Sequence, residues 1–452
     1  MRKTPLLAAF VLLASSVARA ETVEVSSTTL LTVGQQPRYR GGAKPDLDTV
    51  SPAYEILSVT ARDIQYAFAS DVKFVVSGWG AKDLAKRRWD AGTESGTFSA
   101  DLTTGYVEGR LFKRYVTVRL GRQLVATGVA RMLQLDGGQV IVLVPLGGAD
   151  LVLNTWAGSP TSQRFQTRSG EKSWNPAGGT FAYGGRLGVT VPWNGLAGRG
   201  LELGASANLV QDGSDPVRRE VGADFRLQPA VVRNLTLAGF GTWSLYDQRL
   251  GEASLAATWT ARPKLHLTAD WRFVEPGLLL ARNSILSVFS ASTWNEVGGG
   301  FRYDLSKNVD AGVDYHLRLE PGETSGTHTG HDAVAHLAWS RGSSTAGAEV
   351  SYLAGLVNGY TGARVFARRE LGKVGALGST FVAADVLGQA FQKKVNGESG
   401  AVTGTLSAGL DLPHGFSAVV SGRAGMTPFL EQTFDVMAKL AYNQTYRSTE
   451  VR

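Results

Sequence analysis

The stretch KLHLTADWRF, residues 264–273, alternates apolar and polar side chains along its whole length. A β-strand turns successive side chains to opposite faces, so this alternation predicts a strand with one apolar and one polar face. The apolar face carries Leu265, Leu267, Ala269, Trp271 and Phe273. Because the same pattern recurs at 201–209, 221–228 and 308–320, most of the chain is predicted to be all-β.

The predicted strands are long. Alternation continues for about nine to thirteen residues, whereas a strand of a soluble sheet has about five or six. A tilted strand that crosses the apolar layer of a membrane needs about nine to eleven residues. Strand length therefore favours a transmembrane β-barrel, and a soluble exported β protein is the alternative.

The first twenty residues have the pattern of an export signal. Arg2 and Lys3 precede an apolar stretch at residues 6–14, and Ala18-Arg19-Ala20 is a small-x-small cleavage site. The apolar stretch is too short to span a bilayer as a helix. We expect a signal peptide at 1–20 that is cleaved after Ala20, a periplasmic lead-in at 21–50 and an outer-membrane barrel at 51–452.

Composition excludes several classes of site. The 452 residues contain no cysteine, which excludes disulfides, thiolate metal sites, a cysteine nucleophile and a lipidated N-terminal cysteine. The formal charge of +7 is spread among interleaved carboxylates. This distribution does not resemble a nucleic-acid-binding surface, so no nucleic-acid partner is expected.

The connections between predicted strands differ in length. Short ones are expected at 261–263, 306–308, 341–343 and 413–415, and longer ones at 212–216, 276–292, 321–330 and 392–399. Outer-membrane barrels have short periplasmic turns and longer extracellular loops. The alternation therefore predicts an antiparallel up-and-down barrel with that asymmetry.

Strand number follows from counting and parity. About 15 strands are expected between 178 and 446, and three more near 71–80, 98–112 and 115–125. A bacterial barrel has an even number, so about 18 strands are predicted, with 16 or 20 as alternatives. The stretch 126–160 alternates poorly and is expected either to cross the membrane or to fold inward.

The polar faces of the strands predict a hydrated lumen of mixed charge, since burying so many charges in a dry core is unfavourable. Pairs of charges that only satisfy one another inside the wall are the alternative interpretation. The candidate pore-lining residues are Arg119, Arg122, Arg131, Asp136, Arg218, Arg226, Lys264, Asp270, Arg272, Asp314, Arg318, Arg364, Arg368 and Arg423.

Catalytic chemistry is not expected. The chain has six histidines, of which His328, His331 and His336 cluster in SGTHTGHDAVAHL. In a strand His331 and His336 point to opposite faces, which favours solvated side chains over a metal site. No serine, base and orienting residue are brought together by the sequence, so no catalytic residues, metal or cofactor are predicted.

The mature chain resembles the β-barrel porins of Gram-negative outer membranes. Its strand at 433–443 resembles the C-terminal strand that such barrels present to their insertion machinery, although the chain continues for ten residues past Tyr442. Residues 115–138, with GRQ followed by Asp136, resemble alginate-export-type porins, which conduct an anionic sugar polymer.

These resemblances imply a channel for hydrophilic molecules, with a lean towards polysaccharide export as part of a secretion apparatus. The implied partners are outer-membrane lipid, a polar solute or polysaccharide, and periplasmic export components. The alternative is a structural barrel that anchors an envelope, adhesion or motility complex and has a plugged lumen. Segments 126–160 and 275–292 distinguish the two, because inward folding of both would close the channel.

Overall fold

The computed structural model describes residues 21–38, 46–66, 69–85, 98–130, 133–161, 164–165, 172–173, 179–192, 200–229, 231–279, 293–321, 326–355, 358–373, 375, 378–428 and 430–447. Three predictions fall outside these ranges. They concern the signal peptide with its cleavage after Ala20, the pore-lining candidate Arg131, and most of the segment 275–292. Among the described residues, no helix is long and apolar enough to span a bilayer.

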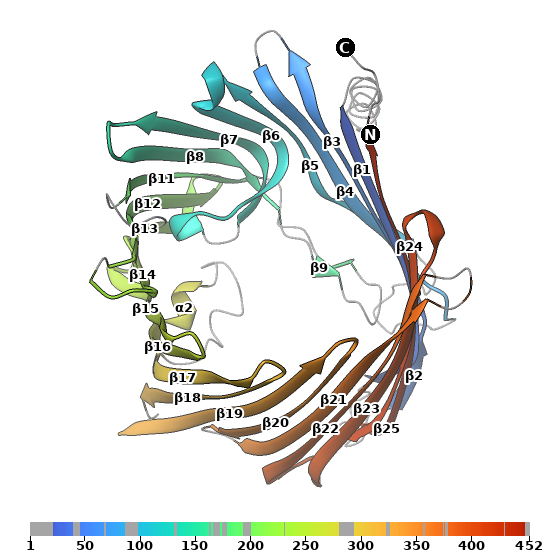
Figure 1. Cartoon of the computed structure of the whole chain (residues 1–452). Helices are drawn as coiled ribbons and strands as arrows, with labels where there is room; N and C mark the ends of the chain where they lie inside the picture. The colour runs from blue at the N-terminus through green and yellow to red at the C-terminus, as the bar shows by residue number, and fades with distance from the viewer. Residues whose placement is uncertain are drawn as a thin grey trace.

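In this part of the chain, 22 antiparallel strands close a barrel and one short strand lies outside the ring (Figure 1). The first eleven are β1 (Thr22–Arg38), β3 (Pro52–Tyr66), β4 (Ala69–Asp83), β5 (Ser99–Leu111), β6 (Val116–Val125), β7 (Leu133–Pro145), β8 (Asp150–Pro160), β11 (Thr180–Pro192), β12 (Gly200–Asp212), β13 (Asp215–Leu227) and β14 (Leu235–Ser244).

The other eleven are β15 (Arg249–Arg262), β16 (Leu265–Val274), β17 (Trp294–Ser306), β18 (Val309–Pro321), β19 (Thr327–Arg341), β20 (Ser344–Ala354), β21 (Gly359–Lys373), β22 (Ser379–Val395), β23 (Glu398–Asp411), β24 (Phe416–Thr427) and β25 (Leu430–Arg447). Each strand pairs with its neighbours in the chain, and β1 closes the ring by pairing residues 22–33 with 436–447 of β25.

The smaller elements are β2 (Asp46–Val50), β9 (Arg164–Phe165), β10 (Lys172–Ser173), α2 (Pro276–Leu279), η1 (Phe112–Arg114), η2 (Gly128–Ala130) and η4 (Pro413–Gly415). β2 pairs only with the last residues of β1. It continues the register in which β3 pairs with β1, so it extends that hairpin beyond the barrel wall.

The expected number of about 18 strands is wrong. The 15 strands expected between 178 and 446 are present as β11 to β25, but residues 22–160 contribute seven strands instead of three. Residues 22–38, expected as part of the lead-in, form β1, and 133–160 cross as β7 and β8. These strands alternate poorly because β1 carries Ser27 and Thr29 among its outward residues and the second half of β7, VIVLV at 140–144, is apolar on both faces.

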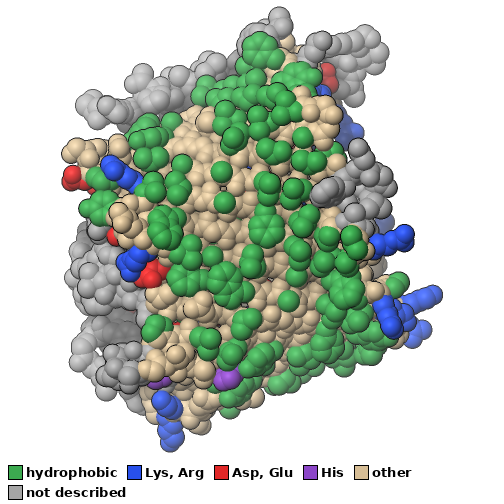
Figure 2. All heavy atoms as spheres, turned by 90° about the vertical axis from the view of Figure 1, so that its left-hand side faces the viewer, with side chains coloured by type: hydrophobic (Ala, Val, Ile, Leu, Met, Phe, Trp, Pro, Cys, Tyr) green, Lys and Arg blue, Asp and Glu red, His purple; other side chains and the backbone are tan. Residues whose placement is uncertain are grey.

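The outer face of the barrel is apolar. Side chains such as Leu187 of β11, Leu203 of β12 and Leu255 of β15 are about half exposed. Figure 2 shows apolar side chains spread over this wall, with lysine, arginine and carboxylates confined to its margins. Strands with an apolar outward face and a polar inward face are those of a membrane barrel.

Connection length separates the two ends of the barrel. End A holds both Thr22 and Arg447 and all four of the expected short turns; end B holds all four of the expected longer connections. Three of the longer ones shorten to 213–214, 322–326 and 396–397 because the strands extend further than alternation predicts. The connection 275–293 is long, as expected, and begins with α2.

A row of glycines crosses β6, β7 and β8. Gly121, with φ +124°, pairs with Gly137, and Gly137 pairs with Gly158. A Cβ on Gly137 would lie 2.6 Å from the Cα of Gly158, and one on Gly121 would lie 2.9 Å from the Cα of Tyr106. Only glycine permits such a close approach of neighbouring strands.

Candidate functional site: a constriction on the inner wall

The segment that follows β6 leaves the barrel wall and lies inside the ring, where it appears in cyan in Figure 1. It includes η2, which contacts β12 and β13. The backbone N–H of Val129 donates a hydrogen bond to Ser206 Oγ of β12 at 3.1 Å. Ser206 therefore points inward, and alternation with cross-strand pairing then assigns the inner face of the other strands. Among the described residues of the stretch 126–160, only 126–130 thus leave the wall for the lumen.

Two glycines allow η2 to lie against the wall. Gly128 has a left-handed φ of +49°, and a Cβ on it would lie 2.6 Å from the Cβ of Ser206. A Cβ on Gly222 of β13 would overlap the side chain of Val129. Val129 is only 2% exposed, so it fills the hollow that Gly222 leaves. We call Val129, Ser206 and Gly222 the η2 latch.

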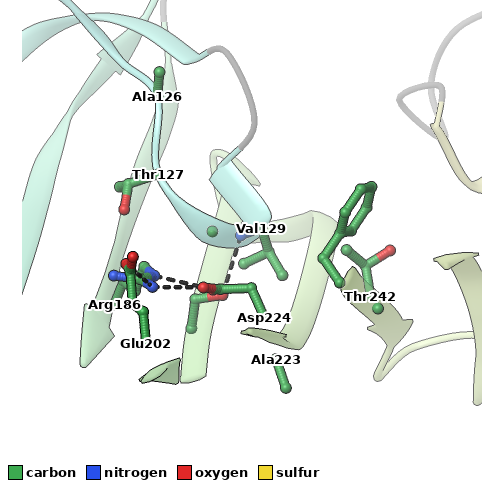
Figure 3. Close-up of a pocket in the computed structure, with 12 residues that line it drawn as sticks. Ala126, Thr127, Val129, Arg186, Glu202, Ala223, Asp224 and Thr242 are labelled. Atoms are coloured by element: carbon green, nitrogen blue, oxygen red, sulfur yellow. Dashed lines mark hydrogen bonds and ion pairs between the residues drawn. The ribbon is translucent and has the colours of Figure 1, made fainter. Parts of the chain in front are cut away.

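Arg186 of β11 holds two carboxylates beside the η2 latch. Its Nε donates to Asp224 at 2.9 Å, and its Nη2 donates to Asp224 at 2.5 Å and to Glu202 at 3.0 Å. Figure 3 shows the three side chains together below η2. One guanidinium against two carboxylates leaves the cluster with one negative charge.

A cavity of about 390 Å³ lies between η2 and the wall. Arg186, Asp224, Phe240 and Thr242 are among the residues that line it. Phe240 pairs with Asp224 and so shares the inner face, where its ring is 39% exposed. An excess of carboxylate beside an exposed ring favours hydroxyl and amine groups over anions at this point.

Elsewhere on the inner wall, arginines pair with carboxylates of the same or a neighbouring strand. The pairs include Arg119–Glu108, Arg272–Glu252, Arg318–Glu296, Arg364–Asp385, Arg368–Glu370 and Arg423–Asp435. Apart from Arg119, these arginine side chains are 41–49% exposed. Such exposure indicates a hydrated inner wall whose charges are locally compensated.

Aromatic rings hold several of these guanidinium groups. The Cζ of Arg119 lies 4.7 Å from the ring centroid of Tyr106, that of Arg318 lies 4.3 Å from Trp294, and that of Arg368 lies 3.7 Å from Phe381. A guanidinium between a carboxylate and a ring face has little freedom to move. The inner wall therefore presents fixed charges.

The basic segment 115–138 does not lie on one face. Arg119 points inward, donates to Glu108 at 2.9 Å and to Gln139 at 3.3 Å. Arg122 is three residues further along β6, on the opposite face, where it bonds Asp136 at 2.7 and 2.8 Å and Asp101 at 3.2 Å. The structure therefore separates two arginines that the sequence groups together.

Alternation places most of the other candidate residues on the inner face. These are Arg218, Arg226, Asp270, Arg272, Asp314, Arg318, Arg364, Arg368 and Arg423. Lys264 instead lies in the turn between β15 and β16, at end A. That these side chains control permeation stays a prediction. Arg186 was missed, although it occupies a polar position in the alternation of 180–192.

The three clustered histidines are all in β19. His336 pairs across to Gly312 and faces inward, and His331 faces outward, where its Nδ1 lies 2.7 Å from the hydroxyl of Tyr315. Among the described residues, no three histidine or carboxylate side chains are placed to hold a metal ion. That the chain is not an enzyme stays a prediction.

No protein-family model and no curated protein matches the chain. Its solved structural neighbours include OccK8 (OprE) of Pseudomonas aeruginosa, with 10% identity over 94% of this chain and 98% of that one, at a TM-score of 0.46. OccAB2 of Acinetobacter baumannii has 9% identity over 94% and 98%, also at 0.46. The translocation pore of the P pilus usher PapC has 10% identity over 93% and 99%, at 0.43. With TM-scores below 0.5, these similarities do not extend to solute or mechanism.

Proposed function

We propose that the chain is a channel in a Gram-negative outer membrane that passes small polar solutes. The observation that carries this proposal is the contrast between the two faces of the wall. The outer face is apolar, as lipid requires, and the inner face carries half-exposed arginines and carboxylates that need water. The η2 latch narrows the lumen from one side. Arg186 and Asp224 lie beside it, on the route that a solute takes through the lumen.

The orientation follows from the connections. End A, with both chain ends and the short turns, faces the periplasm in this proposal, and end B faces the exterior. The inward residues 126–130 leave the wall at end B and reach Ser206 at the middle of β12, so a solute from outside meets the η2 latch about halfway along the lumen. The mixed charges beside it favour polar solutes over apolar ones.

Conductance of the purified protein in planar lipid bilayers tests the proposal. Stepwise insertion with a stable single-channel current is the expected result. If protein that shows a β-sheet circular dichroism spectrum inserts without any current, the proposal fails. The plugged structural barrel that anchors an envelope, adhesion or motility complex then becomes the better account.

Export of a polysaccharide, with periplasmic partners, is a narrower form of the proposal. Its support is the resemblance of 115–138 to alginate-export-type porins, together with the inward position of Arg119 beside Tyr106. Arg122 and Asp136 of the same segment lie on the other face and lend no support. Block of the single-channel current by oligomers of an acidic polysaccharide, added from end A, is the expected result. If the oligomers leave the current unchanged, polysaccharide export is contradicted, but the proposal of a channel for small polar solutes is not.

A further inference from the structure

Three breaks in strand register fall together at end A of β3, β4 and β5. Pairing shifts on either side of Ile64 in β3, and again between Ser70 and Lys73 in β4. Asp63 and Asp71, with left-handed φ of 64° and 52°, lie in these breaks. A β-bulge redirects a side chain, and bulges are common at barrel rims and beside functional sites. Here the breaks bring consecutive side chains, such as Arg62 and Asp63, to one cavity.

That cavity has a volume of about 560 Å³ and lies against the inner wall at end A, far along the strands from the η2 latch. The connection between β5 and β6 contributes Arg114, whose φ of 80° is rare for a residue with a long side chain. Left-handed non-glycine residues concentrate at functional sites, because the surrounding structure must hold them there. The backbone at this end is thus shaped around the cavity.

Cations outnumber the carboxylates that are available to them. Arg62, Lys73, Arg110 and Arg114 line the cavity, with Glu24, Asp63 and Asp71 as counter-charges. The fourth carboxylate, Glu108, is bonded to Arg119, which does not line the cavity. Among the described lining residues, four cations thus face three carboxylates, which leaves an excess of one positive charge.

Lys73 carries the charge that is least compensated. Its Nζ lies 5.7 Å from the ring centroid of Tyr106, and no carboxylate of a described residue lies within 4.0 Å of it. Asp71 Oδ2 accepts hydrogen bonds from Arg110 Nη1 at 3.0 Å and pairs with Arg114 Nη2 at 3.2 Å, so it holds both guanidinium groups at the cavity. A guanidinium has five N–H donors, and the pair with Asp71 uses one donor of Arg114.

We propose that this cavity binds a small oxyanion of the phosphate or carboxylate class. Lys73 and Arg114 donate to the anion, and Asp71 acts as a positioning residue for Arg110 and Arg114. The site lies at end A, whereas the acidic cluster at Arg186 lies at the middle of β11. The proposal goes beyond conduction and does not depend on it, since a plugged barrel would hold the same cavity.

Calorimetric titration of the detergent-solubilised full chain with inorganic phosphate tests the site, and a parallel titration with acetate separates phosphate from carboxylate. Saturable binding is expected with at least one of the two. Lys73→Gln and Arg114→Gln should each weaken it at least fivefold, and Lys73→Arg should largely retain it. Arg368→Gln, on the far wall, is the matched control and should change affinity less than twofold.

The absence of saturable binding to both anions would overturn the proposal, and so would equal weakening by Lys73→Gln and Arg368→Gln. Circular dichroism of each variant shows whether the barrel has formed. If Lys73→Gln does not fold, Arg114→Gln alone decides the result, because Arg114 lies in a turn. Conductance, measured separately, reports on the channel and not on this site.

Discussion

Arg119 and Arg122 are close in sequence and lie on opposite faces of β6, so they should affect different properties. Arg119→Gln leaves Glu108 on the inner wall without its guanidinium, which should shift the lumen towards cation selectivity. Arg122→Gln should leave selectivity unchanged, because Arg122 bonds Asp101 and Asp136 on the other face. Reversal potentials in a salt gradient measure both. A selectivity change in Arg122→Gln as large as that in Arg119→Gln would contradict the facing described above.

Loss of Arg122 should instead reduce stability. Its side chain is 17% exposed and pairs with both Asp101 and Asp136, so its removal breaks two ion pairs. Breaking a buried ion pair costs about 3–5 kcal/mol, less where water reaches it. Urea unfolding followed by circular dichroism should show a lower midpoint for Arg122→Gln than for Arg119→Gln.

Ser206 holds the η2 latch by one hydrogen bond. Ser206→Ala removes the acceptor for the Val129 N–H and should cost about 1 kcal/mol, which raises the population of the released segment about fivefold. Open-channel current noise, or the mean conductance, should rise. Ser421→Ala is a matched control, because Ser421 also faces inward, on β24. Equal noise in the two variants would show that residues 126–130 do not narrow the lumen.

At the scale of elements, the glycine row sets the shape of the wall at β6–β8. Gly137→Val and Gly158→Val each place side-chain atoms against the backbone of a neighbouring strand. Each should lower the free energy of unfolding by about 1–3 kcal/mol or more. Gly404 and Gly422 lie on the outer face, and a Cβ on either would have no neighbour within 4 Å, so their valine variants are controls. The fraction of folded protein recovered in detergent measures the effect. If the control variants lose as much folded protein, close approach of strands at the glycine row is not what makes these positions sensitive.

Individual elements differ in how far their sequence predicts them. Strands β11 to β25 were predicted because lipid and water select opposite residue types on their two faces. β7 was not predicted with the same certainty of position, because much of its inner face is also apolar. Leu135, for example, is fully buried in a cluster with Val125 and Trp156. β1 was not predicted as a strand of the barrel, because its outward face carries the polar residues Ser27 and Thr29. Their hydroxyl groups donate hydrogen bonds to Glu55 of β3.

The site was less predictable than the strands. Alternation identifies which side chains of one strand point inward, and it placed Arg226, Asp270 and Arg364 on the polar face. It does not show that 126–130 leave the wall, because that depends on Gly222 of a distant strand leaving room for Val129. Contacts between strands remote in sequence, such as Arg186 with Asp224, are set by the register around the ring.

At the scale of the whole molecule, closure of the ring can be tested by cross-linking in a chain that has no cysteine of its own. Thr28 and Ala441 are directly paired between β1 and β25. Paired Cα atoms about 4.5–5.5 Å apart suit a disulfide. Thr28→Cys with Ala441→Cys should cross-link under mild oxidation, and Thr28→Cys with Lys439→Cys, two residues out of register, should do so much less. Equal yields would contradict the register, as would no cross-link in either.

Closure between β1 and β25 also imposes an order on biogenesis. Hairpins along the chain form between neighbours, but the two edges of 17 and 18 residues find each other only after the last strand has been delivered. Until then the nascent chain has unpaired edges that can pair with other chains, and loop closure over its full length makes the final step slow. Both edges must therefore be kept from other chains until β25 arrives, and a chain truncated before β25 should be degraded instead of accumulating as an open sheet.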